Sequence, residues 1–214
     1  MSMKRVLETL RENDKEFTTA AEIKDYSRKF YYNFNNVIRY LVNQKYLLQI
    51  FEGIYYVKSE QEIESKKLKY SLLELVGKGL ELKGITDWYY GLYTALTLNG
   101  VKEEEHDKDL FYIITNRLFK GAPIEIAGRS FKFIKFKYSL FNFGIIDRKV
   151  KFSDKEKTVL DFIYLWKYNG IHSQKIIVDI AKYMDMVEEE KILDYVRYYP
   201  KTNKRILKEA LSKR

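Results

Sequence analysis

The sequence predicts an α+β protein, in which an N-terminal winged helix-turn-helix domain is followed by a mixed α/β C-terminal domain. Three observations support this fold class. Three short helical patterns precede a two-strand pattern within residues 1–60. Helical and β-rich stretches then alternate through residues 85–214, after a charged connection over residues 61–84. Apolar residues make up 46% of the 214 positions, which suffices for a substantial core.

The first two expected helices carry local signals for their faces and ends. In the stretch MKRVLETLREN, one helical face is apolar and consists of Val6, Leu7 and Leu10. Further on, Thr18 or Thr19 is a natural N-cap, and Glu22 follows Thr19 at the spacing of a capping box. A second, short helix is therefore expected directly after these threonines.

A third helix is expected over residues 32–44, followed by a hairpin. Its apolar stripe comprises Phe34, Val37, Ile38 and Leu41. The stretch KYLLQIFEGIYYV then contains two β-rich runs separated by Glu52-Gly53, a two-residue turn in which glycine can adopt positive φ. The order helix, helix, helix, hairpin is that of a winged helix.

The outward face of this third helix suggests a nucleic-acid ligand. If the apolar stripe points inward, helical geometry points outward Tyr32, Asn33, Asn35, Asn36, Arg39 and Tyr40. Asparagine can pair with adenine and arginine with guanine in the major groove, each worth roughly 1–3 kcal/mol of discrimination. Phosphate contacts would come from the flanking Arg28, Lys29, Tyr31 and Lys45, and from a backbone amide at Thr18 or Thr19. Faces rich in tyrosine and asparagine also occur in protein interfaces, so a protein-interaction module is the alternative.

Charge is compatible with an anionic partner. The formal net charge is +9, and residues 24–58 hold six basic but only two acidic residues. There is no cysteine, no run long enough to span a bilayer and no signal-peptide pattern, so a cytoplasmic protein without disulfides is expected.

The second domain is expected to mix strands and helices. A helix is predicted over residues 87–100 with Asp87 as its N-cap, and glycines 77, 79 and 84 are interpreted as a boundary or turn. Strands are predicted at residues 109–116 and 143–152, with a hairpin between them that turns at Ala127-Gly128. Another helix is predicted from Ser153, as N-cap with Glu156 in a capping box, to Asn169-Gly170.

Catalytic and metal motifs are absent from the sequence, so we expect neither an enzyme nor a cofactor. His106 and His172 lack ligand-like spacing, and there is no phosphate-binding glycine loop before a helix. Acidic residues near β-segments (Asp109, Glu125, Asp147) could form a nuclease centre only if further residues filled the remaining catalytic roles.

Several stretches, in order over roughly residues 5–170, resemble the AbiEi family, the antitoxins of type IV toxin–antitoxin systems. They are the winged-helix pattern, WYYGLYTALTLNGV, FKFIKFKYSLFNFGI and, most specifically, VKFSDKEKTVLDFIYL. The segment from Ser153 to Asp161 resembles the family's helix start, with Lys155 in place of the usual proline.

The resemblance implies a transcriptional autorepressor that binds inverted repeats in its own promoter as double-stranded DNA. It also implies that the C-terminal domain counters a nucleotidyltransferase-like toxin, without a stable complex. The DNA contacts would lie on the outward face of the third helix and at the Glu52-Gly53 turn, so Gly53 joins the candidates. Arg129, Lys132, Lys135 and Lys137 could add contacts, although a solvated strand explains them more simply. A solitary winged-helix regulator without a toxin partner would share these features.

Overall fold

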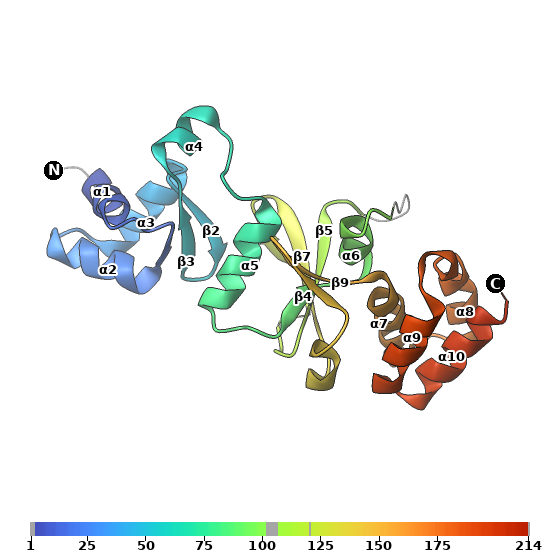
Figure 1. Cartoon of the computed structure of the whole chain (residues 1–214). Coiled ribbons are helices and arrows are strands. Elements are labelled where there is room, and N and C mark those ends of the chain that lie inside the picture. The colour runs from blue at the N-terminus through green and yellow to red at the C-terminus, as the bar shows by residue number, and fades with distance from the viewer. Residues whose placement is uncertain (1–2, 102–106, 120, 214) are drawn as a thin grey trace. The chain divides into compact units, whose positions relative to one another are not determined.

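The structure is a computed structural model that describes residues 3–101, 107–119 and 121–213, and it is a mixed α+β fold (Figure 1). The chain divides into two compact units. The N-terminal unit extends to Thr86 and includes Glu125–Gly128, and the C-terminal unit comprises Asp87–Ile124 and the chain from Arg129 onward.

The N-terminal unit combines helices with a small antiparallel sheet of strand order β1-β3-β2. Its elements are α1 (Lys4–Glu12), β1 (Phe17–Thr19), α2 (Ala20–Lys29), α3 (Phe34–Asn43), β2 (Leu47–Phe51), β3 (Ile54–Val57), α4 (Glu60–Ser65) and α5 (Leu72–Leu82). The expected apolar face of α1 is confirmed, because Val6, Leu7 and Leu10 are fully buried in one core with Ile23 and Val37.

Local signals in this unit act as the sequence predicts. Thr19 is the N-cap of α2 and forms a capping box with Glu22. The hairpin turns at Glu52-Gly53, where Phe51 pairs with Ile54 and Gly53 has φ +75°. That value lies in the left-handed region that glycine occupies at little cost.

Residues 61–84, expected as a connection, belong to the N-terminal unit and carry α4 and α5. The glycines at 77 and 79 lie inside α5 and do not end it, which corrects the prediction of a turn there. A Cβ on Gly79 would lie 2.8 Å from Cγ2 of Ile50, so the missing side chain lets α5 pack closely on β2. Gly84, with φ +69°, does follow the end of the helix.

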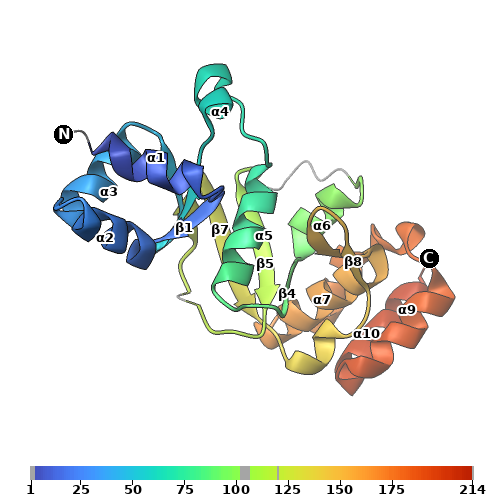
Figure 2. The same cartoon turned by 60° about the vertical axis from the view of Figure 1, so that its left-hand side comes forward.

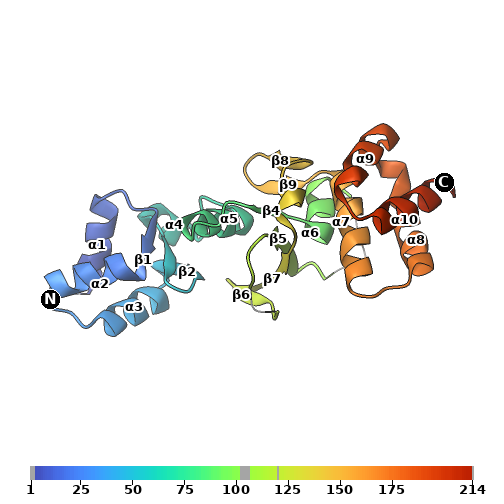
Figure 3. The same cartoon turned by 90° about the horizontal axis from the view of Figure 1, so that it is seen from below.

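The C-terminal unit holds most of a six-stranded mixed sheet of order β6-β7-β5-β4-β9-β8. The strands of this sheet are β4 (Trp88–Tyr90), β5 (Leu110–Thr115), β6 (Ile124–Ile126), β7 (Arg129–Lys135), β8 (Ile145–Asp147) and β9 (Lys151–Ser153). Of β6, only Ile124 belongs to the C-terminal unit, since Glu125–Gly128 is part of the N-terminal one. The helices of the C-terminal unit are α6 (Leu92–Leu98), α7 (Lys155–Tyr168), α8 (Ser173–Ala181), α9 (Glu189–Tyr195) and α10 (Lys201–Leu211), with 3₁₀ turns at Tyr138–Phe141, Met184–Met186 and Val196–Tyr198. Helix α7 contacts α6, α8, α9 and α10, so it forms the centre of the helical part (Figures 2 and 3).

Three predictions for this unit are corrected. Residues 88–90 form a strand, and Gly91 begins the helix that Asp87 was expected to cap, because Trp88–Tyr90 pairs with β5 and β9. The expected strand over 143–152 is a hairpin of β8 and β9. Asp154, and not Ser153, caps α7, since its carboxylate accepts the Lys157 amide at 2.8 Å. The predicted strand β5, the turn at Ala127-Gly128 and the end of α7 at Asn169 are confirmed.

Candidate nucleic-acid interface

Helices α2 and α3 are joined by a tight turn that fixes the direction of α3. The amide of Tyr32 donates to the carbonyl of Ser27 at 2.8 Å, and the amide of Tyr31 donates to that of Arg28 at 3.0 Å. Tyr31 occupies the left-handed region at φ +60°, and its side chain is 97% exposed. Ser27 is buried and its hydroxyl donates to the Ile23 carbonyl at 2.6 Å, which holds the last turn of α2 against the core.

Helix α3 buries one face and exposes the other, as its apolar period predicts. Val37 and Leu41 are fully buried, while Phe34 and Ile38 are half-buried against the same core. The exposed side chains of this helix are Asn35, Asn36, Arg39 and Asn43. Arg39 is exposed, and within the described residues it forms no ion pair. No carboxylate there neutralises the charge of its guanidinium. We call Asn35, Asn36, Arg39 and Asn43 the α3 face.

Three other residues that the sequence predicts to point outward, Tyr32, Asn33 and Tyr40, also have a role in the fold. The side chain of Asn33 caps α3 by accepting the Asn36 amide at 3.2 Å, although Asn33 is also exposed. Tyr32 and Tyr40 are half-buried and pack at the edge of the core. Their ring centroids lie 6.4 Å from that of Phe30 and 6.2 Å from that of Tyr46, respectively. Only the remaining surface of the two tyrosines is open to a ligand.

The predicted phosphate-binding residues divide into exposed side chains and two threonines whose polar groups are engaged within the fold. Arg28, Lys29 and Lys45 are exposed, and Arg28 lies 4.0 Å from Asp25 in an exposed ion pair. Thr18, in contrast, is only 1% exposed, and its hydroxyl donates to Glu22 at 3.1 Å. The Thr19 amide donates to the same carboxylate at 3.0 Å. Neither threonine therefore presents a free backbone donor or side chain of the kind the sequence suggested.

The hairpin turn is short and lies against the start of α2. The carbonyl of Gly53 accepts the Ala20 amide at 2.9 Å, and Gly53 is half-buried. Its neighbour Glu52 is exposed and acidic. This turn therefore offers an anionic ligand little beyond the backbone of Gly53.

Two exposed residues, one on α2 and one on the α3 face, are absent from the contacts predicted from the sequence. Lys24 lies one turn before Arg28 on α2, and Asn43 lies one turn after Arg39 on α3. The spacing of four residues that places them beside Arg28 and Arg39 was visible in the sequence.

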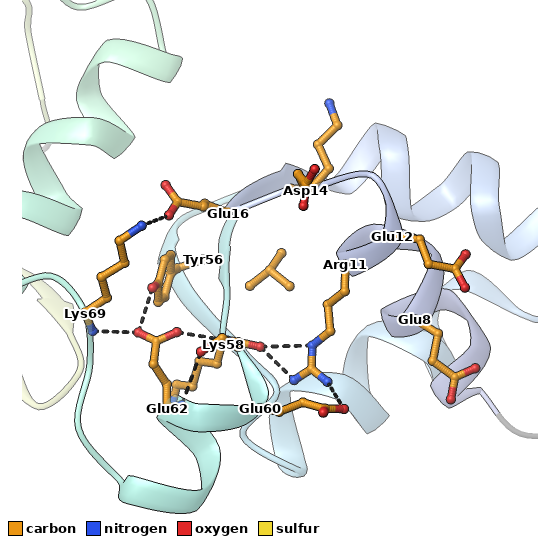
Figure 4. A pocket seen from close by; sticks show the side chains of 13 residues that line it. Glu8, Arg11, Glu12, Asp14, Glu16, Tyr56, Lys58, Glu60, Glu62 and Lys69 are labelled. Atoms are coloured by element: carbon orange, nitrogen blue, oxygen red, sulfur yellow. Dashed lines mark hydrogen bonds and ion pairs between the residues drawn. The ribbon is translucent and has the colours of Figure 1, made fainter.

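Acidic side chains of the N-terminal unit gather elsewhere, around a cavity of about 850 Å³ at the far end of β3 (Figure 4). Its charged lining consists of Glu8, Glu12, Asp14, Glu16, Glu60 and Glu62, with Arg11, Lys15, Lys58 and Lys69. Arg11 bridges α1 to the chain before α4, donating to the Lys58 carbonyl at 2.8 Å and to Glu60 at 3.0 Å. The α3 face contributes no residue to this cavity.

Glu62 is the buried anchor of this acidic region. Its carboxylate accepts the Tyr56 hydroxyl at 2.7 Å and the backbone amides of Lys69 and Ser59 at 2.7 and 2.8 Å (Figure 4). Burial favours the neutral acid, but these hydrogen bonds outweigh it and hold the pKa of Glu62 below its usual range. Lys69 also pairs with Glu16, so the chain between α4 and α5 is tied to β1 and β3.

The interpretation of acidic residues as a nuclease centre gains no support from their surroundings. Asp109 pairs with Arg129, its carbonyl accepts the Ser130 amide at 2.9 Å, and Glu125 and Asp147 are exposed. In the described part of the chain, no three acidic, histidine or cysteine side chains are grouped as metal ligands. His172 precedes α8 at the surface, and His106 lies outside the described residues.

The C-terminal unit has a buried polar cluster centred on helix α7. Lys157 and Asp161 are both fully buried, 3.4 Å apart from Nζ to Oδ1. The hydroxyls of Tyr89 and Tyr199 donate to Asp161 at 2.8 and 2.6 Å. Burial lowers the pKa of Lys157 and raises that of Asp161, because each charged form loses hydration. The cluster is closed to solvent and serves packing.

Comparison with known proteins gives a likeness of fold. No protein-family model and no curated protein matches the chain. The crystal structure of the Rv2827c protein from Mycobacterium tuberculosis is similar, with a TM-score of 0.56 and 11% identity over 98% of this chain and 75% of that one. At this identity the likeness concerns the fold alone. Among the described residues, no helix combines the length and apolar character needed to cross a membrane.

Proposed function

We propose that the chain is a sequence-specific, double-stranded-DNA-binding transcriptional regulator, and that its N-terminal unit is a winged helix-turn-helix with α3 as recognition helix. The observation that carries the proposal is the joint exposure of Asn35, Asn36 and Arg39 on a helix that has no acidic residue. Six acidic side chains of the unit line a cavity at the other end of β3, to which α3 contributes nothing.

The roles of the residues follow from the chemistry of the duplex. The amides of Asn35 and Asn36 suit the adenine edge, and the guanidinium of Arg39 suits the guanine edge, in the major groove. Phosphates on either side would be held by cations near both ends of the helix pair, Lys24, Arg28, Lys29 and Lys45. Because the hairpin turn is short and carries Glu52, the helix pair and not the turn would supply most of the charge contacts.

The finer assignment rests on the resemblance to the AbiEi family. It makes the protein an autorepressor of its own promoter and the non-enzymatic antitoxin of a type IV system, acting in the cytoplasm against a nucleotidyltransferase-like toxin. A solitary winged-helix regulator is the alternative within the same class. A protein-interaction module is the alternative from another class, and it would leave the α3 face bound to a protein partner.

The experiment is a binding titration of the whole chain against its own upstream DNA, with a scrambled duplex of equal length as competitor, at two salt concentrations. Phosphate contacts weaken as salt rises, but base contacts keep their preference for sequence. We expect a preference for the native sequence that survives the higher salt. Equal affinity for both duplexes, lost at the higher salt, would refute a sequence-specific regulator and favour the protein-interaction module.

A further inference from the structure

A second cavity, of about 720 Å³, lies inside the C-terminal unit. Its walls come from β5 and β7 of the sheet and from α6 and α7. Helix α6 contacts both β5 and α7 (Figure 3). The volume falls within the range of small-ligand sites. The cavity shares no residue with the α3 face, so an inference drawn from it stands apart from the proposed function.

Aromatic rings make up much of the wall. They include Tyr93, Tyr112, Phe133, Phe136, Phe162, Tyr164, Trp166 and Tyr168. Phe133, Phe136 and Phe162 are buried in the core. Edge-to-face packing on two of them holds the partly exposed tyrosines in place, since the rings of Phe136 and Tyr164 lie 4.9 Å apart and those of Tyr93 and Phe162 lie 4.8 Å apart. The partly exposed rings of the wall, Tyr93, Tyr112, Tyr164, Trp166 and Tyr168, are the surfaces on which a planar ligand can stack.

Three lysines are among the residues that line the same cavity. Lys132, Lys135 and Lys137 come from β7 and the residues just after it. The parallel pairing of β5 with β7 sets Lys132 beside Tyr112 on the same face of the sheet, and Lys135, three positions further along β7, lies on the opposite face. Among the lining residues that the structure describes there is no aspartate or glutamate, and no described carboxylate pairs with these three lysines. The positive charge of the cavity is therefore uncompensated.

From these two features we infer that the cavity binds a nucleotide unit, with the base against the aromatic rings and the phosphate at the lysines. The same chemistry would be offered by a free nucleotide and by one residue of a single-stranded nucleic acid. A duplex does not fit the inference, because its bases are already stacked and paired. Lys132, Lys135 and Lys137, which the sequence alone assigned to a solvated strand or to duplex contacts, are thus the phosphate ligands of a separate site.

The test uses the intrinsic fluorescence of the whole protein, which contains two tryptophans, Trp166 in the cavity wall and Trp88 buried in β4. Adenosine monophosphate, a single-stranded oligonucleotide of about eight nucleotides, and inorganic phosphate are titrated separately. We expect saturable quenching by one or both nucleotide ligands. If adenosine monophosphate and the oligonucleotide bind with equal affinity per site, the ligand is a free nucleotide. If the oligonucleotide binds more tightly, the ligand is a single-stranded nucleic acid. The inference would be overturned if neither adenosine monophosphate nor the oligonucleotide bound. It would also be overturned if inorganic phosphate at the same concentration displaced the bound nucleotide ligand.

Paired variants separate the cavity from general electrostatics. Lys135 and Lys137 are exposed, so Lys135→Ala/Lys137→Ala should fold normally and weaken nucleotide binding by about tenfold. The matched control is Lys149→Ala/Lys201→Ala, which removes two exposed charges of the same unit away from the cavity. Equal weakening in both double variants would contradict a defined site.

A further comparison, between a variant of the cavity wall and a double variant of the α3 face, separates this site from the α3 face. Trp166→Leu, followed by calorimetry instead of fluorescence, should also weaken nucleotide binding because it removes a stacking surface. Asn36→Ala/Arg39→Ala should leave nucleotide binding unchanged. If nucleotide binding were lost with the α3 face and kept in the cavity variants, the ligand would belong to the N-terminal unit, and the inference would fail without touching the proposed function.

Discussion

The hydroxyl of Tyr89 donates to Oδ2 of Asp161 at 2.8 Å, across 72 positions of sequence, and ties strand β4 to the middle of helix α7. The same carboxylate accepts Tyr199 and lies beside Lys157, whose ammonium is 4.6 Å from the ring centroid of Phe143. A charged pair is thus enclosed by hydroxyls and rings in the interior of the C-terminal unit. Such a buried pair stabilises a fold only when it is intact, because removing one side chain leaves the charge of the other buried without a counter-charge.

Removing Lys157 alone should therefore be far more damaging than removing both charges. We expect Lys157→Met to lower the free energy of unfolding by about 3–5 kcal/mol, since Asp161 stays buried without its counter-charge. Lys157→Met/Asp161→Asn should recover part of that loss. Both tryptophans belong to the C-terminal unit, so denaturant unfolding followed by tryptophan fluorescence reports on this unit. Lys167→Met on the same helix is the control, with an expected change within about 0.5 kcal/mol. Additive losses in the double variant would disprove the coupling.

On the α3 face, base contacts and phosphate contacts should separate in binding experiments. Asn36→Ala or Arg39→Ala should weaken binding to the protein's own upstream DNA by about 1–3 kcal/mol, and leave scrambled duplex unaffected. Lys29→Ala or Lys45→Ala should weaken binding to every duplex and reduce the slope of affinity against salt by about one unit.

Lys15→Ala is the matched control for these charge changes, because Lys15 pairs with Glu22 at 3.0 Å and lines the acidic cavity. Its DNA affinity should stay that of the wild type. Unchanged affinity for the upstream DNA in all four face variants would show that α3 does not read the sequence.

Acid should destabilise the N-terminal unit through Glu62. Its pKa in the folded state is held below the ordinary value of 4.5, mainly because hydrogen bonds to the carboxylate overcome its burial. A carboxyl with a lowered folded pKa contributes stability above its unfolded pKa, and this contribution is lost as pH falls through the folded pKa. Stability should thus decline from about pH 4.5 downward, and Glu62→Gln should show a shallower decline.

Far-UV circular dichroism during denaturant unfolding measures this effect, because the N-terminal unit contains no tryptophan. Glu64→Gln, an exposed carboxylate on the same helix, is the control. An identical decline in wild type and Glu62→Gln between about pH 5 and pH 3 would assign the acid sensitivity to other groups.

Features decided within a few residues were predictable from the sequence. The Thr19–Glu22 capping box and the turn at Glu52-Gly53 depend on local hydrogen bonds and on the φ freedom of glycine, and both form as predicted. The inward and outward sides of α3 likewise follow from the helical period. Most of the α3 face was therefore readable without a structure.

Other features depend on partners that are distant in the chain. Trp88–Tyr90 satisfied a helical pattern but forms a strand, because β5 and β9 offer backbone partners on both sides. Gly79 looked like a break, yet it lies inside α5 because Ile50 and Phe51 leave no room for a side chain there. Thr18 looked available but is buried beside Glu22.

The α+β class, the first three helices with the hairpin after them, and the residues that α3 exposes could be predicted from the sequence, since these depend on local periodicity and capping. The tertiary structure was needed to show that six acidic side chains line a cavity at the far end of β3, that Lys157 and Asp161 meet out of contact with water, and that three lysines share a cavity with aromatic rings. Each of these arrangements joins side chains far apart in sequence, and their meeting depends on how the strands and helices pack.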